Sequence, residues 1–308
     1  MEKWKSVSKK RLAFTIVELL TVMAVIAILI SLLVPALALV KAFAKEIEQR
    51  AQLHSITVAI DMFAANSGYG TYPPSNDNSM PPLDPQDPTP YGGAQKLAEA
   101  LVGWDLLGYH PKSSFISDGD GSAGLGQPVY DPTNRRNMDE RKGPFIELEN
   151  ANAYRLGDIY ANVQSFDPLN YVLCDVYAKK RTLAVNQANK KTGMPILYYR
   201  ARAENFNQTF DLLAGAPAAN GIEDDIYYYP DNQNLLLLGA PDDGALIHPI
   251  ADDAAIVDDY LDFENMILNN EIITIRRPYR AGSYILISAG KDGRYGKADD
   301  ITNFTTAE

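Results

Sequence analysis

The longest uninterrupted apolar segment of the chain lies near its start, between Leu19 and Val40. It contains no charged side chain over about 22 residues. A helix rises about 1.5 Å per residue, so this segment is long enough to cross the ~30 Å hydrocarbon core of a bilayer. Residues 1–13 are polar and basic. Since positive charge stays on the cytoplasmic side, the pattern predicts a single-pass segment in the inner membrane, with a cytoplasmic N-terminus and the bulk of the chain outside.

The helical pattern continues beyond the apolar segment, where it becomes amphipathic. Leu53, Ile56, Ile60 and Phe63 recur at three- and four-residue spacing and form one apolar stripe, while charged residues at 41–50 supply a solvated face. Turn-forming residues at 66–70 end the pattern. We therefore expect one helix over residues 14–66, with its second half packed on a sheet.

The rest of the chain predicts a globular α+β domain with an antiparallel sheet. A proline-rich loop covers residues 71–91, and a short helix is expected at 93–103. Short segments rich in β-branched and aromatic residues predict strands at 145–148, 171–177, 196–201, 226–229, 272–276 and 284–288. Residues 109–143 have no regular pattern, and residues 252–269 fit one more amphipathic helix. Strands that follow a helix without regular βαβ alternation favour this class.

Composition narrows the kinds of partner. The formal net charge of −11 argues against binding nucleic acid, which needs Lys and Arg patches, and is compatible with hard cations such as calcium. The single cysteine, Cys174, lies in an apolar run and is expected to be a small core residue. The three histidines are too scattered for a zinc site.

Two ordinary interpretations of the first apolar segment leave part of it unexplained. A cleavable secretory signal has a shorter apolar region followed by a small-residue cleavage site. Ala36 and Ala38 could form such a site, but the segment is too long. A plain signal anchor explains the length and the basic flank. It does not explain Glu18, since a carboxylate at the edge of an apolar segment is costly and suggests a function.

A third interpretation accounts for Glu18. The stretch from Lys9 to Leu20 (KKRLAFTIVELL) closely resembles the class III signal of type IV prepilins and type II secretion pseudopilins. The resemblance implies cleavage between Ala13 and Phe14 by a prepilin peptidase and methylation of the new N-terminus. Glu18 becomes the fifth residue of the mature chain. The family usually has glycine where this chain has Ala13.

The resemblance also implies how such a subunit assembles. The apolar helix is kept, and the Glu18 carboxylate pairs with the Phe14 ammonium of a neighbouring copy in a helical filament. An unpaired carboxylate in that apolar core would cost several kcal/mol, so a subunit out of register is penalised. Pro35 stands at the family's helix-breaking position and is expected to let the helix bend. Further partners implied are other pseudopilins and the inner-membrane assembly platform.

A second motif lies near the far end of the chain, at residues 288–304. Three glycines and three carboxylates occur close together there, and calcium prefers mixed carboxylate and carbonyl oxygens. A solvated acidic turn is the simpler alternative. The segment strongly resembles the calcium-binding C-terminal loop of major pseudopilins. That resemblance implies Asp292 and Asp300 as side-chain ligands, Asp299 as a weaker one, and carbonyl oxygens from Ser288 and Ala289.

Together these patterns predict a prepilin leader at 1–13, a transmembrane and assembly helix at 14–66, and a periplasmic, pilin-like globular domain at 67–308. Residues 104–283 are expected to be a large insertion. The function indicated is a structural subunit of a type II secretion pseudopilus. The alternatives are a type IV pilin, or a minor or tip pseudopilin that binds substrate through the insertion. No nucleophile elbow, nucleotide loop or metal-binding histidine pair indicates an enzyme.

Overall fold

The computed structural model describes residues 15–79, 89–119, 128–180, 190–202, 204–205, 208, 225–241, 248–251 and 263–304. The chain divides into two compact units, residues 1–47 and 48–308. The predicted leader and Phe14 lie outside the described residues.

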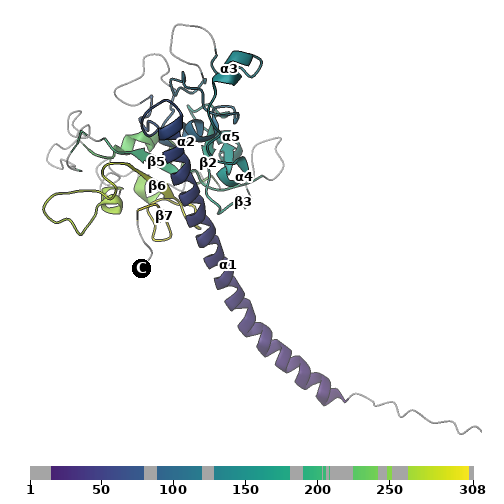
Figure 1. The fold of residues 1–308 in the computed structure, drawn as a ribbon. Coiled ribbons are helices and arrows are strands. Elements are labelled where there is room, and N and C mark those ends of the chain that lie inside the picture. The colour runs from purple at the N-terminus through teal and green to yellow at the C-terminus, as the bar shows by residue number, and fades with distance from the viewer. Residues whose placement is uncertain are drawn as a thin grey trace, which may run out of the picture. The chain divides into compact units, whose positions relative to one another are not determined.

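The helix α1 (Ile16–Asn66) is continuous over 51 residues and includes Pro35. Figure 1 draws it as one long helix. A helix of this size is about 77 Å long. It confirms the predicted single long helix to within two residues at its start. The helix continues through Pro35 without a break, and the bend expected there stays a prediction.

In the first unit, α1 is apolar on all sides. Its large hydrophobic side chains from Ile16 to Val40 are between 49% and 81% exposed. The hydroxyls of Thr21 and Ser31 donate to the carbonyl oxygens of Glu18 and Ile28 within the same helix, at 3.0 and 2.8 Å. By length and composition α1 can cross a membrane, where such internal hydrogen bonding is required.

The second unit is built on a three-stranded antiparallel sheet in the order β5 (Leu197–Arg200), β6 (Tyr284–Ser288), β7 (Ile301–Thr302). Tyr198 pairs with Leu286, and Ser288 pairs with Ile301. Every residue of the central strand β6 is buried. An apolar strand buried on both faces requires a layer on each side of the sheet.

The second half of α1 forms one of these layers. Its stripe residues pack with α2 (Gly93–Val102) on the sheet face that carries Tyr198, Tyr284 and Leu286. Leu197, Tyr199, Ile285 and Ile287 point to the opposite face, because side chains alternate along a strand. That face is covered by aromatic residues from loops and short helical turns, among them Tyr227, Tyr229, Phe263 and Tyr295. The sheet is therefore the middle of three layers.

Shorter elements complete the second unit. The strands β1 (Ala153–Arg155) and β2 (Tyr171–Leu173) pair antiparallel, as do β3 (Lys179–Lys180) and β4 (Lys191–Thr192). The short helices are α3 (Arg135–Glu140), α4 (Leu148–Ala151), α5 (Leu156–Ile159) and α6 (Gln233–Leu236), with 3-10 turns η3 (Tyr229–Asp231) and η4 (Pro249–Ala251). Helices with small antiparallel sheets confirm the α+β class.

Three predicted strands are wrong. Residues 145–148 lead into α4, with the Phe145 ring 5.8 Å from that of Phe63. Residues 226–229 are buried, but they lie outside any strand and lead into η3. Residues 272–276 form no strand, and Ile273 is 93% exposed. In all three segments the β-branched and aromatic side chains either pack in the core or are exposed. No described strand lies beside these segments to pair with them, so their composition alone does not make a strand.

The other predictions are closer. β6 has the predicted bounds, β5 lies inside 196–201, and β2 is shorter than the predicted 171–177. The helix α2 lies where it was expected, and residues 71–79 and 89–92 have no regular element. Of the helix expected at 252–269, residues 263–267 are helical and residues 252–262 lie outside the described part. Residues 104–283, expected as an insertion, supply β5 and so help to build the sheet.

Candidate functional site

The first candidate site is the start of α1. The Thr15 N–H and hydroxyl both donate to Glu18 Oε2, at 2.9 and 2.7 Å, and the Glu18 N–H donates to Thr15 Oγ1 at 3.2 Å. This reciprocal arrangement is a capping box, which satisfies backbone N–H groups that the first turn leaves without partners. Glu18 thus has a local role at the helix start that the sequence analysis did not assign. Ala13 and Phe14, the predicted cleavage pair, lie outside the described residues.

Capping leaves part of the Glu18 carboxylate free for other contacts. Only Oε2 takes part in the capping box, and Oε1 accepts no hydrogen bond from the described residues. Glu18 is also exposed. One carboxylate can therefore fix the first turn of its own helix and face a cationic group of another molecule.

Pro35 has a limited effect on α1. A proline has no N–H, so the carbonyl of Ser31, four residues earlier, loses its intrahelical donor. In hydrocarbon such a carbonyl needs another donor or a local adjustment of the helix. Pro35 lies within the exposed apolar half of α1, five residues before Val40.

The second candidate site is the loop between β6 and β7. Its carboxylates accept hydrogen bonds from loop backbone: Asp299 Oδ2 from the Asp292 N–H at 2.9 Å, and Asp292 Oδ1 from the Arg294 N–H at 2.7 Å. Gly290 has φ +61°, and a Cβ there would lie 2.1 Å from the Asp299 carbonyl oxygen. The loop therefore folds back tightly on itself, and only glycine fits at this approach.

Asp300 is the most unusual group of this loop. Its Oδ2 accepts from the Gly296 and Lys297 N–H groups at 2.7 and 3.3 Å. Its Oδ1 is buried and has no hydrogen-bond partner in the described part of the chain. Burial, together with the negative charges of Asp299 and Asp292, raises the pKa of Asp300 to about 7, against the lowering effect of the two backbone N–H groups. An added cation would relieve both costs.

Ser288 and Ala289, the predicted carbonyl ligands, lie where β6 enters the loop. The Ser288 hydroxyl donates to Asp175 Oδ2 at 3.2 Å and accepts from the Gly290 N–H at 3.3 Å. The Ala289 carbonyl accepts from the Gly293 N–H at 3.2 Å. Asp175 itself is 1% exposed, and its Oδ1 accepts from the Tyr177 and Met194 N–H groups. This buried carboxylate anchors the loop to the end of β2.

Sequence reasoning missed Asp175. The available signal was one carboxylate inside the otherwise apolar run from Tyr171 to Val176. A second tether was not predictable: the Lys179 ammonium donates to the Asp292 carbonyl at 2.7 Å. Both tethers join the same two regions, so the loop is held in place by contacts from outside it.

The donor set decides which metals the loop suits. Among the described residues, no three Asp, Glu, His or Cys side chains come together as metal ligands. A cation here would have to bind carboxylates together with backbone carbonyls, which is the mixture that calcium accepts and zinc does not. The unpartnered Asp300 oxygen and the carbonyls beside Gly290 fit such a site.

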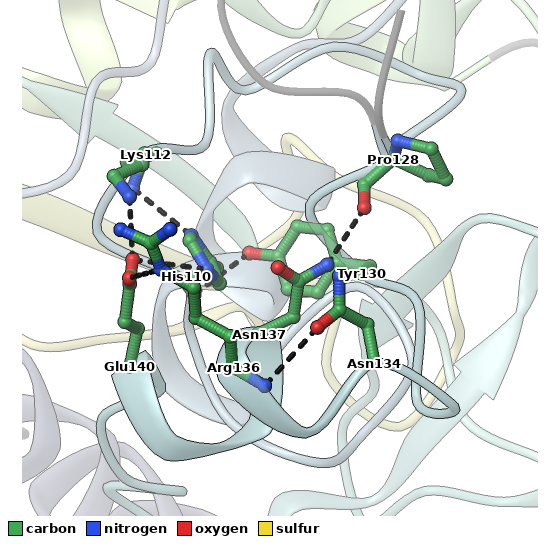
Figure 2. Close-up of polar contacts among 8 residues, drawn as sticks. All are labelled: His110, Lys112, Pro128, Tyr130, Asn134, Arg136, Asn137 and Glu140. Carbon is green, nitrogen blue, oxygen red and sulfur yellow. Dashed lines mark hydrogen bonds and ion pairs between the residues drawn. The ribbon is translucent and has the colours of Figure 1, made fainter.

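The histidines do not form a metal centre. Figure 2 shows His110, whose Nδ1 accepts from the Lys112 N–H at 3.2 Å and whose Nε2 lies 3.8 Å from Glu140 Oε2. Glu140 also binds Lys112 at 2.6 Å and Arg136 at 3.0 Å. Burial is the main cause that lowers the pKa of His110. The cluster fixes α3, whose N-cap is Asn134, to the body of the unit.

Comparison of the chain with protein-family models, curated proteins and solved structures finds no match.

Proposed function

We propose that this protein is a structural subunit of a type II secretion pseudopilus. It is made as an inner-membrane precursor, cut before Phe14 by a prepilin peptidase and methylated there. It then assembles with further copies through the first half of α1, in contact with other pseudopilins and the inner-membrane assembly platform. The second unit lies in the periplasm.

The observation that carries this proposal is the contrast between the two halves of α1. The first half is apolar and exposed on all sides, while the second half buries one stripe in a folded core. A helix that is apolar all round must be covered by lipid or by other helices. A continuous helix that is apolar in one half and fixed in a domain in the other suits a subunit that exchanges lipid for copies of itself.

Glu18 fixes how each subunit is aligned with its neighbour in the filament. The Phe14 ammonium created by cleavage can pair with Glu18 of a neighbouring subunit through the oxygen that capping leaves free. Removing one partner of a buried ion pair costs about 3–5 kcal/mol, so misaligned subunits are rejected.

Calcium completes the proposal at the second site. In this proposal Asp300 is the first carboxylate ligand, Asp292 and the weaker ligand Asp299 approach it when the ion binds, and Ser288 and Ala289 supply carbonyl oxygens. The ion places a positive charge beside the buried Asp300 carboxylate. It thereby stabilises the loop between β6 and β7.

The mature N-terminus tests the class of protein. Mass spectrometry of the chain purified from its own membrane should find a first residue of methylated Phe14. The variant Ala13→Gly, which restores the family's usual residue, should be cut at least as completely. A chain that starts near residue 39, or one that retains residues 1–13, contradicts the proposal.

A further inference from the structure

A polar cavity of about 230 Å³ lies on the second unit and is lined by no residue of either candidate site. Three segments line it: the loop that follows α1, the end of β5 and the turn η3. The lining side chains with charged or hydrogen-bonding groups are Ser75, Asn76, Arg200, Arg202, Glu204 and Asp231. Its volume equals that of about eight water molecules at ~30 Å³ each, which is the size of a small metabolite.

Hydrogen bonds fix the three walls to one another. The Ser75 hydroxyl accepts from the Arg200 N–H at 3.0 Å and donates to Asp231 Oδ2. One residue beyond Asp231, the Asn232 amide donates to the Tyr198 carbonyl of β5 at 2.8 Å. The Tyr198 hydroxyl in turn donates to the Pro73 carbonyl at 2.8 Å. The cavity is therefore formed before any ligand arrives.

Asp231 lines the cavity, and one of its two carboxylate oxygens has no hydrogen-bond partner among the described residues. Asp231 is 2% exposed, and its Oδ1 has no hydrogen bond within the described residues. Arg202 Nη2 is the cation beside it, at 4.0 Å, which is too long for a hydrogen bond. Burial raises the pKa of Asp231 to about 6, against the lowering effects of Ser75, Arg202 and Lys96. A buried carboxylate oxygen without a donor is costly, so a donor from a ligand would stabilise it.

The wall formed by β5 carries the opposite charge. Arg200 and Arg202 are two residues apart on an extended segment, and both line the cavity. The Arg202 guanidinium is held 4.1 Å over the Tyr228 ring. The Arg200 guanidinium makes no hydrogen bond or ion pair with the described residues. A guanidinium in such a position suits a carboxylate, which it can bind through two parallel hydrogen bonds.

The two signs of charge decide the ligand class. A simple cation would face Arg200 and Arg202, and a simple anion would face Asp231 and Glu204, so neither ion alone is favoured. A dipolar molecule satisfies both walls. We propose that this cavity binds a small zwitterion of the amino-acid type, with its ammonium donating to Asp231 Oδ1 and its carboxylate accepting from Arg200. This inference is independent of the proposed function.

Binding can be tested on the full-length chain in detergent at pH 7.5, by calorimetric titration and by thermal unfolding. The probes are the standard amino acids, each tested up to about 10 mM. Three controls separate the contributions of the two charges and of the N–H donors. Acetate carries only a carboxylate, methylammonium carries only an ammonium, and glycine betaine carries both charges but no N–H donor.

At least one amino acid should release or absorb heat on saturation and raise the Tm by about 2–4 °C at roughly ten times its Kd. The three controls should do neither. Asp231→Asn and Arg200→Met should weaken binding at least tenfold. Arg135→Met, which removes a guanidinium from a side chain that is 94% exposed on α3, should leave binding unchanged.

Other outcomes overturn the proposal. If no amino acid binds, the cavity holds water alone. If glycine betaine or acetate binds as well as the best amino acid, the paired recognition is wrong. Arg200 lies at the edge of the cavity and is only half-buried, so Arg200→Met should fold even if Asp231→Asn does not. Unchanged affinity in a folded Arg200→Met variant therefore refutes the role of this wall.

Discussion

Glu18 has two roles that one substitution can separate. The capping box needs an oxygen at this position, and glutamine supplies one, because the motif accepts either Glu or Gln. Pairing with the Phe14 ammonium needs the negative charge. Glu18→Gln should therefore keep the helix start and remove the intersubunit pair. Thr15→Ala does the reverse, since it removes the hydroxyl that bonds Glu18 at 2.7 Å and leaves the charge.

The expected sizes of the two effects differ. Loss of a cap costs about 0.5–2 kcal/mol, and the effect is confined to the first turn of the helix. Glu18→Gln keeps the capping oxygen, so it should destabilise the helix start by only a few tenths of a kcal/mol. Loss of one partner of a buried pair costs about 3–5 kcal/mol for each subunit contact. At about 1.4 kcal/mol per tenfold change, this weakens subunit addition by roughly two to three and a half orders of magnitude.

The assay compares three forms of the chain in cells that also express the assembly platform. Membrane fractionation measures insertion, mass spectrometry confirms the mature N-terminus, and shearing followed by ultracentrifugation measures filaments. Wild type and Thr15→Ala should both give filaments, the latter with a modest loss. Glu18→Gln should insert and be processed normally but give almost no filament.

Two outcomes would contradict an assembly role for the Glu18 charge. If Glu18→Gln assembles as well as wild type, the charge has no assembly role and Glu18 is only a capping residue. If Thr15→Ala fails as severely as Glu18→Gln, the helix start, rather than the charge pair, limits assembly.

Two further predictions concern the second unit. Asp300 has a pKa of about 7 in the folded state and about 3.9 when unfolded, so the folded state binds the extra proton. The metal-free chain should thus lose stability as pH rises from about 4 to 7, and Asp300→Asn should flatten this loss. Calcium should raise the Tm of wild type at pH 8 and raise it less at pH 6. It should not raise the Tm of Asp300→Asn. If a chelator leaves the Tm of wild type unchanged at pH 8, the calcium site is contradicted. Phe63→Ala should lower the free energy of unfolding by about 3–5 kcal/mol, measured by urea titration followed by fluorescence. Phe63 is fully buried, and its ring centroid lies 4.9 Å from that of Tyr109. Val58→Ala on the 45% exposed side of the same helix should change it by less than about 0.5 kcal/mol, and equal effects would show that this half of α1 is not a core element.

The parts of the fold that the sequence predicts well are those with long or strict periodicity. α1 combines an uncharged run with a regular stripe, and β6 is a dense apolar segment, so each pattern admits one structure. The segment 226–229 has equally suitable composition but folds as a buried turn. Its burial comes from aromatic packing, and no local pattern distinguishes that from a strand.

Buried polar groups show the same limit. The helix α2 was expected from Leu97 and Leu101, yet Lys96 and Glu99 on its other faces are also buried. Lys96 donates to Asn78 at 2.7 Å, and Glu99 accepts from the Tyr130 hydroxyl at 2.9 Å. Both partners lie far away in sequence. A charged residue is read as exposed until the fold supplies its partner.

The candidate sites divide in a similar way. The spacing of Thr15 and Glu18 matches the capping box, so the sequence contained that signal, although Glu18 was interpreted only as an assembly residue. The cavity lined by Arg200 and Asp231 had no sequence signal. It exists because Ser75 binds two segments that each lie more than a hundred residues further along the chain.

The layer formed by α1 also constrains when the protein can fold. The Tyr284 hydroxyl donates to the Thr57 carbonyl across 227 positions of the chain, and Leu286 lies in the same core as Ile60. Synthesis proceeds at about 5–20 residues per second, so the apolar stripe of α1 waits roughly ten seconds or longer for the strand that covers it. During that time the first half of α1 can already be inserted in the membrane. In the proposed membrane subunit, insertion can therefore come before folding, and the chain is most exposed to aggregation and proteolysis while the stripe is uncovered.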